Sequence, residues 1–238
     1  MFRLLTRLGD IYNADKMIPI GSVQVAGVSY KSIGDPGLEF LEDLAQKGAR
    51  VQVLTFLNPA GMDLEAWDTL NFPRDFSQKQ LRIIKAFKQM GIVPTATCTP
   101  YLIGNLPRFG EHIAWSESSA VSFANSVIGA RTNREGGPSA LAAALCGLTP
   151  NYGLHLSQNR IPEMIIEVKT HIRTLADFGA LGHLIGKHVK NKIPYITGIT
   201  DATTDHLKSL GAAMAASGAV ALYHIKDITP ESYHMDVK

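Results

Sequence analysis

Two arginines stand close to a pair of glycines in the stretch GARTNREGGPSA, residues 129–140. Arg131 and Arg134 flank a threonine and an asparagine and come shortly before Gly136 and Gly137. Guanidinium groups bind carboxylates and phosphates through paired hydrogen bonds, and glycines let backbone N–H groups approach a ligand closely. The stretch is therefore typical of a site for a small anionic substrate, although surface charge would also account for the arginines.

Three predicted strand exits carry further residues that can contact a substrate. They are Gly27, Val28 and Ser29, then Asn58 and Pro59, and then Cys98. The first exit offers bare backbone and a hydroxyl, and the second offers a carboxamide next to the fixed backbone of a proline. Ligands of open α/β sheets bind beyond the carboxyl ends of the strands, so neighbouring exits would share one crevice. Taken singly, each of the first two motifs is also compatible with an ordinary turn.

Only two cysteines occur in the chain, Cys98 and Cys146. With so few thiols and no export signal, a disulfide framework is not expected. Cys98 lies between threonines at a predicted strand end, where a thiolate can bind iron, whereas Cys146 is expected as a small buried helix residue. Because an iron–sulfur cluster needs three or more thiolates, further ligands would have to lie elsewhere.

Acid–base groups occur in RFGEHIAWSESSA, residues 108–120. Glu111 and His112 are candidates for proton transfer. Glu117 is expected instead in the first turn of a helix that Ser116 caps. No H-x-x-x-H or H-E-x-x-H pattern is present, so a zinc site is not expected, and P-loop, Rossmann and G-x-S-x-G patterns are absent as well.

Composition narrows the class of protein further. The chain has 238 residues, 45% of them hydrophobic, with a formal net charge of +2. No run of lysines and arginines forms the basic stripe of a nucleic-acid-binding protein. No stretch of about 20 apolar residues occurs, so neither a membrane span nor a signal peptide is expected. These features favour a cytoplasmic protein without a membrane or nucleic-acid partner.

The elements that must position these residues alternate between strands and helices. Strands are expected at 22–30, 50–57, 93–101, 152–156, 163–170, 193–199 and 219–228, and helices at 35–48, 76–91, 117–129, 139–147, 174–189 and 203–218. Such alternation predicts an α/β fold with parallel sheets and right-handed crossovers. Two lobes are expected, over residues 1–150 and 151–238.

Several long blocks of the sequence resemble the large subunit of the aconitase X family. They are AGVSYKSIGDPGLEFLEDLA, TFLNPAGMDLEAW, QLRIIKAFKQMGI, the central block from TCTPYLIGN to SALAAALCG, and LGAAMAASGAVALYHI. The resemblance implies an aconitase-like fold, in which parallel-sheet lobes carry helices on both faces. It implies a hydro-lyase and a small partner subunit that closes the active site. Family large subunits extend beyond both ends of this sequence, so the chain is expected to be a fragment.

Motifs that match the family assign its site residues to positions in this sequence. The resemblance implies that Gly27, Val28, Ser29, Asn58 and Pro59 contact the substrate, and that Cys98 binds an iron–sulfur cluster, of the four-iron type, whose other ligands lie outside this chain. When bound, such a cluster supplies an iron that polarises the departing hydroxyl.

Three functions remain open at this point. The first is dehydration of mevalonate 5-phosphate to trans-anhydromevalonate 5-phosphate, a step of the mevalonate pathway of isoprenoid biosynthesis. The second is dehydration of cis-3-hydroxy-L-proline. The third is an inactive fragment that only binds a partner. The absence of further cysteines that could bind a cluster favours this third function.

Overall fold

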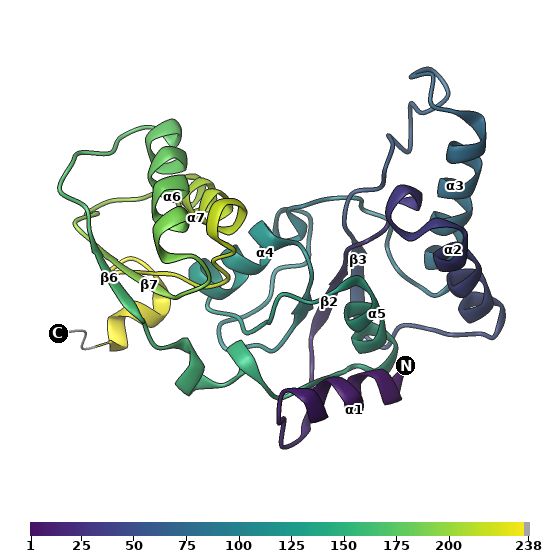
Figure 1. Cartoon of the computed structure of the whole chain (residues 1–238), viewed down its shortest axis with the longest axis horizontal. Coiled ribbons are helices and arrows are strands. Elements are labelled where there is room, and N and C mark those ends of the chain that lie inside the picture. The colour runs from purple at the N-terminus through teal and green to yellow at the C-terminus, as the bar shows by residue number, and fades with distance from the viewer. Residues whose placement is uncertain (236–238) are drawn as a thin grey trace. The chain divides into compact units, whose positions relative to one another are not determined.

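The structure is a computed structural model that describes residues 1–235 (Figure 1). The chain forms two compact units, each assembled from several segments. Unit 1 comprises Met1–Asn105, Ala114–Glu117 and Glu135–Pro150, and unit 2 comprises Leu106–Ile113, Ser118–Arg134 and the chain after Pro150. The chain therefore passes between the units five times.

Unit 1 is built on a parallel sheet with the strand order β3-β2-β4. Its strands are β2 (Ser22–Val25), β3 (Leu54–Leu57) and β4 (Ala114–Trp115). Gln24 in the central strand lies opposite Phe56 on one side and Trp115 on the other. All four residues of β2 are buried, as expected of a central strand with covered faces. A separate antiparallel pair joins β1 (Met17–Pro19) to β5 (Leu148–Pro150).

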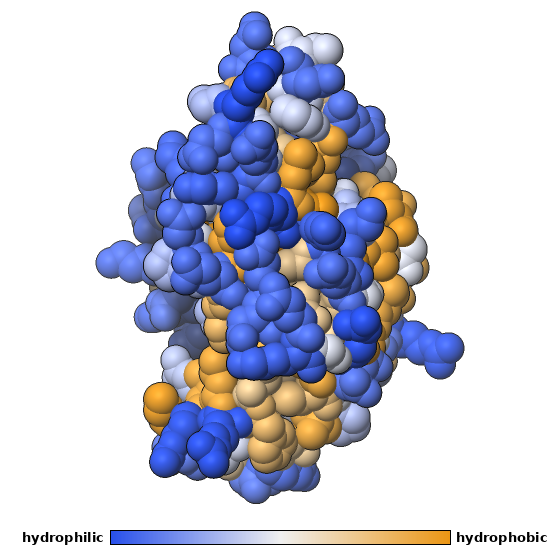
Figure 2. All heavy atoms as spheres, turned by 90° about the vertical axis from the view of Figure 1, so that its right-hand side faces the viewer, coloured by the Kyte–Doolittle hydropathy of each residue, from blue (hydrophilic) through white to orange (hydrophobic). Residues whose placement is uncertain are grey.

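The helices of unit 1 are α1 (Phe2–Ile11), α2 (Tyr30–Gln46), α3 (Arg74–Gln89) and α5 (Gly137–Cys146). Helices α2 and α3 lie side by side and bury Leu38, Leu41 and Phe87 in the core of the unit (Figure 1). Helix α2 is kinked at Gly34, whose φ of 60° is left-handed, just before Pro36. Figure 2 shows the side that carries α2 and α3 covered largely by hydrophilic residues, with apolar patches between them.

Unit 2 contains a second parallel sheet, in the order β6-β7-β8. Its strands are β6 (Met164–Glu167), β7 (Pro194–Thr197) and β8 (His224–Ile225). Helices α6 (Leu175–Val189) and α7 (Thr204–Gly218) lie side by side (Figure 1). They approach so closely that a Cβ atom on Gly186 would lie 2.8 Å from the carbonyl oxygen of Met214. Each begins with a capping box, at Thr174 in α6 and at Thr203 in α7.

A short helix, α4 (Ser118–Phe123), packs against α7 within unit 2. It continues as a π-helical turn over Ala124–Ile128 and ends at Gly129, whose φ is 76°. Among residues 1–235, no helix combines the length and the apolar character that crossing a membrane requires.

The predicted α/β class with parallel sheets is confirmed, and so are the main helices. The strand predicted at 93–101 is wrong, because only Val93 forms a bridge, with Phe56, before Ala96 turns left-handed at φ 47°. Residues 100–102 form a 3₁₀ turn, which begins at Pro100. The strand predicted at 152–156 is a 3₁₀ turn as well. Proline and positive-φ residues interrupt these runs, which the apolar pattern alone does not reveal.

The strand predicted at 50–57 is confined to its second half, β3. Val51 and Gln52 donate their backbone N–H groups to the carbonyls of Met90 and Ala144, at 2.9 and 2.8 Å. These carbonyls lie at the ends of α3 and α5. The first half of the predicted strand therefore caps two helices instead of extending the sheet.

Candidate functional site

The carboxyl edge of the unit 1 sheet gathers all three predicted strand exits. Asn58 donates its backbone N–H to the carbonyl of Val25, at 2.9 Å, and Thr97 donates to the carbonyl of Leu57, at 3.1 Å. Because β2 and β3 are parallel neighbours, the segments 27–29 and 58–59 leave the sheet side by side. Cys98 follows at the next position along the same edge.

A buried glutamine ties this edge together. The side chain of Gln24, fully buried in β2, donates from Nε2 to the carbonyl of Thr97 at 2.9 Å. Its Oε1 accepts the backbone N–H of Glu117 at 3.3 Å. One side chain thus links the segment that carries Cys98 to the end of β4.

A second buried glutamine, Gln80 of α3, holds the first exit. Its Nε2 donates to the carbonyl of Val28, and its Oε1 accepts the N–H of Tyr30, each at 2.9 Å. Between these contacts Ser29 is the N-cap of α2, and its hydroxyl accepts from the N–H of Lys31 at 3.3 Å. Sequence reasoning missed both glutamines, since only the fold shows that they are buried.

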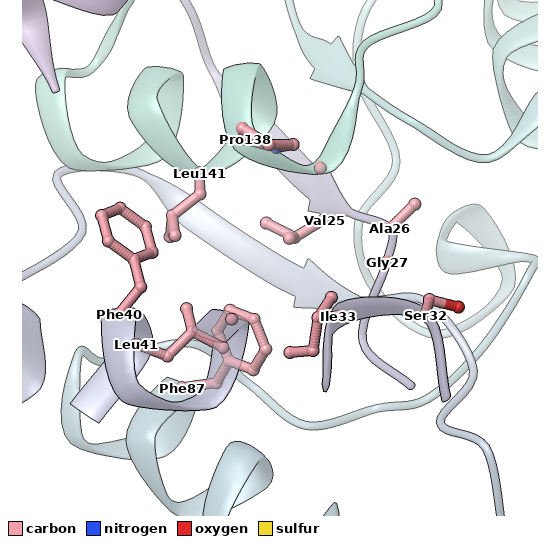
Figure 3. Close-up of a pocket in the computed structure, with 12 residues that line it drawn as sticks. Val25, Ala26, Gly27, Ser32, Ile33, Phe40, Leu41, Phe87, Pro138 and Leu141 are labelled. Carbon is pink, nitrogen blue, oxygen red and sulfur yellow. The ribbon is translucent and has the colours of Figure 1, made fainter. Parts of the chain in front are cut away.

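Gly27 takes the left-handed conformation that its position requires, with φ 74°. The start of α5 lies directly against this exit, since a Cβ atom on Gly137 would come within 2.5 Å of the carbonyl oxygen of Ala26. Neighbouring side chains of α2, α3 and α5, among them Leu41, Phe87 and Leu141, enclose an apolar cavity of about 290 Å³ beside Gly27 (Figure 3). The exit of β2 therefore has an apolar wall on its helix side.

Cys98 is exposed at this edge. Its neighbours Thr97 and Thr99 join their hydroxyls at 3.2 Å, which closes a tight turn around the thiol. Partial burial, and to a lesser degree the carboxylate of Glu117, raise the pKa of the Cys98 thiol. A bound cation would oppose both effects and favour the thiolate.

The fit of an iron–sulfur cluster to these residues is incomplete. Within residues 1–235, no three His, Cys, Asp or Glu side chains come together as a metal site would require. Cys98 is a single exposed thiol at this edge, and Cys146 lies in α5. The described residues therefore do not hold a cluster by themselves.

Three buried polar atoms without a hydrogen-bond partner occur next to this edge. They are Asn58 Oδ1, Ser116 Oγ and Glu135 Oε1. Asn58 follows β3 and Ser116 follows β4, and the N–H of Glu135 donates to the carbonyl of Trp115 at 2.9 Å. Buried polar atoms are normally paired, so such a group points to ordered water or a ligand.

The other predicted site residues lie in unit 2. Arg131 forms a bridge with His112, and its N–H donates to the carbonyl of Glu111 at 2.8 Å. The guanidinium of Arg131 donates to the carbonyl of His155 at 2.9 Å. The carboxylate of Glu111 accepts the N–H of Arg108 at 2.7 Å. These groups thus stabilise one another, and exposed Arg134 follows in the same segment.

His112 and His155 form a pair whose Nδ1 atoms lie 3.0 Å apart, so one ring must donate and the other accept. Burial and the surrounding positive charges lower both pKa values, that of His155 to about 3. Both rings are therefore neutral at neutral pH, and His112 suits a proton acceptor better than a donor.

Arg160 is the central buried charge of unit 2. It is 2% exposed and contacts the carboxylate of Glu231 with its Nε and Nη2 atoms, the shortest distance being 2.8 Å. Further donor groups bond the side chain and carbonyl of Asn125 and the carbonyl of Leu154. All its contacts lie inside the unit, which indicates a structural role.

Comparison with known proteins gives these two units a family. The family model described as the aconitase X first domain matches residues 1–158, and the model of the aconitase X second domain matches residues 162–238. This chain belongs to the aconitase X family. The expected resemblance is thereby confirmed.

Relatives of this aconitase X chain agree over nearly its whole length. It is 60% identical to the phosphomevalonate dehydratase large subunit of Methanocaldococcus jannaschii over 235 residues, which are 96% of this chain and 58% of the relative. It is 36% identical to the cis-3-hydroxy-L-proline dehydratase of Pseudomonas aeruginosa, over 97% of this chain and 40% of that protein. The chain thus spans a little more than half of the first relative and less than half of the second.

A crystal structure of Thermococcus kodakaraensis aconitase X in its holo form has the same fold. The TM-score is 0.90 at 54% sequence identity, over 99% of this chain and 59% of that one. The aconitase-like fold expected from the sequence is therefore confirmed.

Proposed function

We propose that this chain is part of the large subunit of a phosphomevalonate dehydratase. The observation that carries the proposal is its 55–60% identity to four archaeal relatives of that name. The reaction removes a hydroxyl and a neighbouring proton, together one water, from mevalonate 5-phosphate. The protein would be a cytoplasmic carbon–oxygen lyase of the mevalonate pathway.

The partner and the cofactor are part of the same proposal. Relatives named as large subunits imply a small subunit, so the active enzyme is a heterodimer of large and small chains. Membership in an aconitase-like family favours a four-iron cluster. Cys98 is its proposed ligand from this chain, and the other ligands lie outside these 238 residues.

The edge of the unit 1 sheet would bind the substrate. Gly27 and Val28 offer backbone atoms, and the fixed backbone of Pro59 orients Asn58, whose unpaired Oδ1 can accept a hydrogen bond from a substrate hydroxyl. Ser29 contributes the remaining hydroxyl.

The proposed roles in unit 2 concern charge and proton transfer. Arg131 and Arg134 can bind the carboxylate or phosphate of the substrate, or stabilise other residues that bind it. Glu111 and neutral His112 are the candidates for accepting a proton.

The first test is the iron and sulfide content, with the visible spectrum, of the complex purified without oxygen. We expect Cys98→Ser to lose the cluster and turnover of mevalonate 5-phosphate. Cys146→Ser is the matched control and should keep both. Retention of the cluster and activity by Cys98→Ser would contradict the ligand assignment.

A second candidate function rests on the 36% and 33% identity to two cis-3-hydroxy-L-proline dehydratases. Turnover of each substrate by the same complex separates the two. Dehydration of the amino acid alone would favour this second candidate.

A further inference from the structure

Glu135 is a buried carboxyl group at the start of α5. It precedes Gly136, the N-cap of the helix, and its backbone N–H is bonded to the carbonyl of Trp115 at the end of β4. Only 6% of the residue is exposed. A glutamate in the polar motif of residues 129–140 is thus enclosed between the sheet and the helix.

The hydroxyl of Ser139 lies between two oxygens, 2.5 Å from Glu135 Oε2 and 3.0 Å from the carbonyl of Gly136. A serine hydroxyl has one proton, so it can make only one full donor bond. If Glu135 is ionised, that proton goes to the carboxylate and the Gly136 contact is lost. If Glu135 carries a proton, it donates to Ser139, and Ser139 donates to Gly136, so that both contacts are hydrogen bonds.

The other carboxyl oxygen, Oε1, has no hydrogen-bond partner, and Glu135 forms no ion pair among the described residues. Strands β2 and β4 contain no titratable residue, and α5 contains only Cys146, at its far end. The charged residues nearest to Glu135 along these segments are Arg134, which precedes it, and Glu117, which follows β4. A buried charge without such compensation is strongly disfavoured, and burial accordingly raises the pKa of Glu135.

The turn at Gly136 lies next to the backbone that follows β2. Gly137, the first residue of α5, packs against the carbonyl of Ala26, which precedes the predicted substrate contact Gly27. Hydrogen bonds that hold the turn at Gly136 in place therefore also position Gly137 against the backbone that leads into Gly27.

We propose that Glu135 is a positioning residue that acts in its neutral form. The protonated carboxyl donates to Ser139 Oγ, and the Ser139 hydroxyl donates to the Gly136 carbonyl. These two hydrogen bonds hold the start of α5 against the exit of β2. The stability part of this inference stands alone, and its effect on substrate binding rests on the proposed function.

The test compares Glu135→Gln, which is neutral at every pH, with the unmodified protein in the full complex. The fold favours the protonated acid, so the unmodified protein loses stability as pH rises above the usual glutamate value of 4.5. Glutamine cannot ionise. Between pH 5 and pH 8 we expect the Tm difference to move in favour of Glu135→Gln by about 2 °C or more. The exposed Glu39→Gln is the control and should show no such shift.

Infrared spectroscopy supplies a second readout. A protonated-carboxyl band at neutral pH that disappears in Glu135→Gln supports the proposal. A Tm difference that does not change with pH, absence of the band, or failure of Glu135→Gln to fold would each overturn it, since a neutral amide should replace a neutral acid.

Kinetics test the link to the site. Glu135→Gln should keep kcat/KM within about threefold, whereas Glu135→Ala should raise KM more than it lowers kcat. A complex without any dehydratase activity would refute the proposed function and leave the stability and infrared results valid. Equal kinetics for all three proteins would refute the positioning of the site alone.

Discussion

At the edge of the unit 1 sheet, two buried glutamine side chains bond the backbone of the segments that leave the sheet. Gln24 and Gln80 satisfy backbone groups of the exits that carry Cys98 and Val28. The sequence singled out these exits as candidate contacts through the motifs Gly-Val-Ser, Asn-Pro and Thr-Cys-Thr, and their role in binding stays a prediction. The sequence could not reveal the glutamines or the burial of Glu135, since polar residues are buried only through the packing of distant segments.

Gly137→Ala tests the closest approach at this edge. The new Cβ would lie 2.5 Å from the carbonyl oxygen of Ala26, so the backbone must shift. We expect a loss of about 1–3 kcal/mol in the free energy of unfolding, measured in urea. Gly136→Ala is the matched control, because its Cβ would meet nothing closer than 3.8 Å, and it should change stability by less than about 1 kcal/mol. Equal losses would contradict the close contact.

At the scale of elements, the sequence predicted α3, α6 and α7 closely, whereas α2 begins at Tyr30 and not at the predicted Asp35. Apolar runs predicted the strands less well. After Val93, positive-φ residues and prolines end the extended conformation, and the backbone N–H groups at the start of 50–57 bond the ends of helices instead of a neighbouring strand. Local sequence therefore determines helices here, whereas tertiary hydrogen bonds determine where strands begin and end.

The Arg160–Glu231 pair is a buried ion pair between two 3₁₀ turns of unit 2. Glu231→Ala leaves a guanidinium that is 2% exposed without its counter-charge, so we expect a loss of about 3–5 kcal/mol in the free energy of unfolding. The exposed pair of Arg82 and Glu42 provides the control, and Glu42→Ala should cost less than about 1 kcal/mol. Chemical denaturation measures both. Similar costs for the two variants would show that Arg160 reaches water.

At the scale of the whole molecule, each unit has a hydrophobic core of its own, but neither is a continuous piece of chain. The division expected at residue 150 stays a prediction. The order of elements along the sequence predicts two lobes, yet it cannot show that residues 106–113 and 118–134 belong with the later one.

A peptide of residues 151–238 should therefore not fold on its own. It lacks α4, which packs on α7, and the partners of His155 and Arg160, namely His112, Arg131 and Asn125. We expect no cooperative thermal unfolding by circular dichroism. Residues 106–238, which restore all these groups, should unfold cooperatively. A cooperative transition in the shorter peptide would contradict this reading of unit 2.

The repeated crossing of the chain also sets an order of events during synthesis. Ser126 emerges from the ribosome long before Tyr223, whose N–H it accepts at 2.9 Å, and the buried face of α4 must wait for α7. Unit 1 can fold once Pro150 has been synthesised. The first two segments of unit 2 cannot complete their packing until the last strand of that unit has been synthesised. A pause in translation before α7 would leave the apolar residues of α4 available to chaperones, and the nascent protein would be exposed to aggregation during that interval.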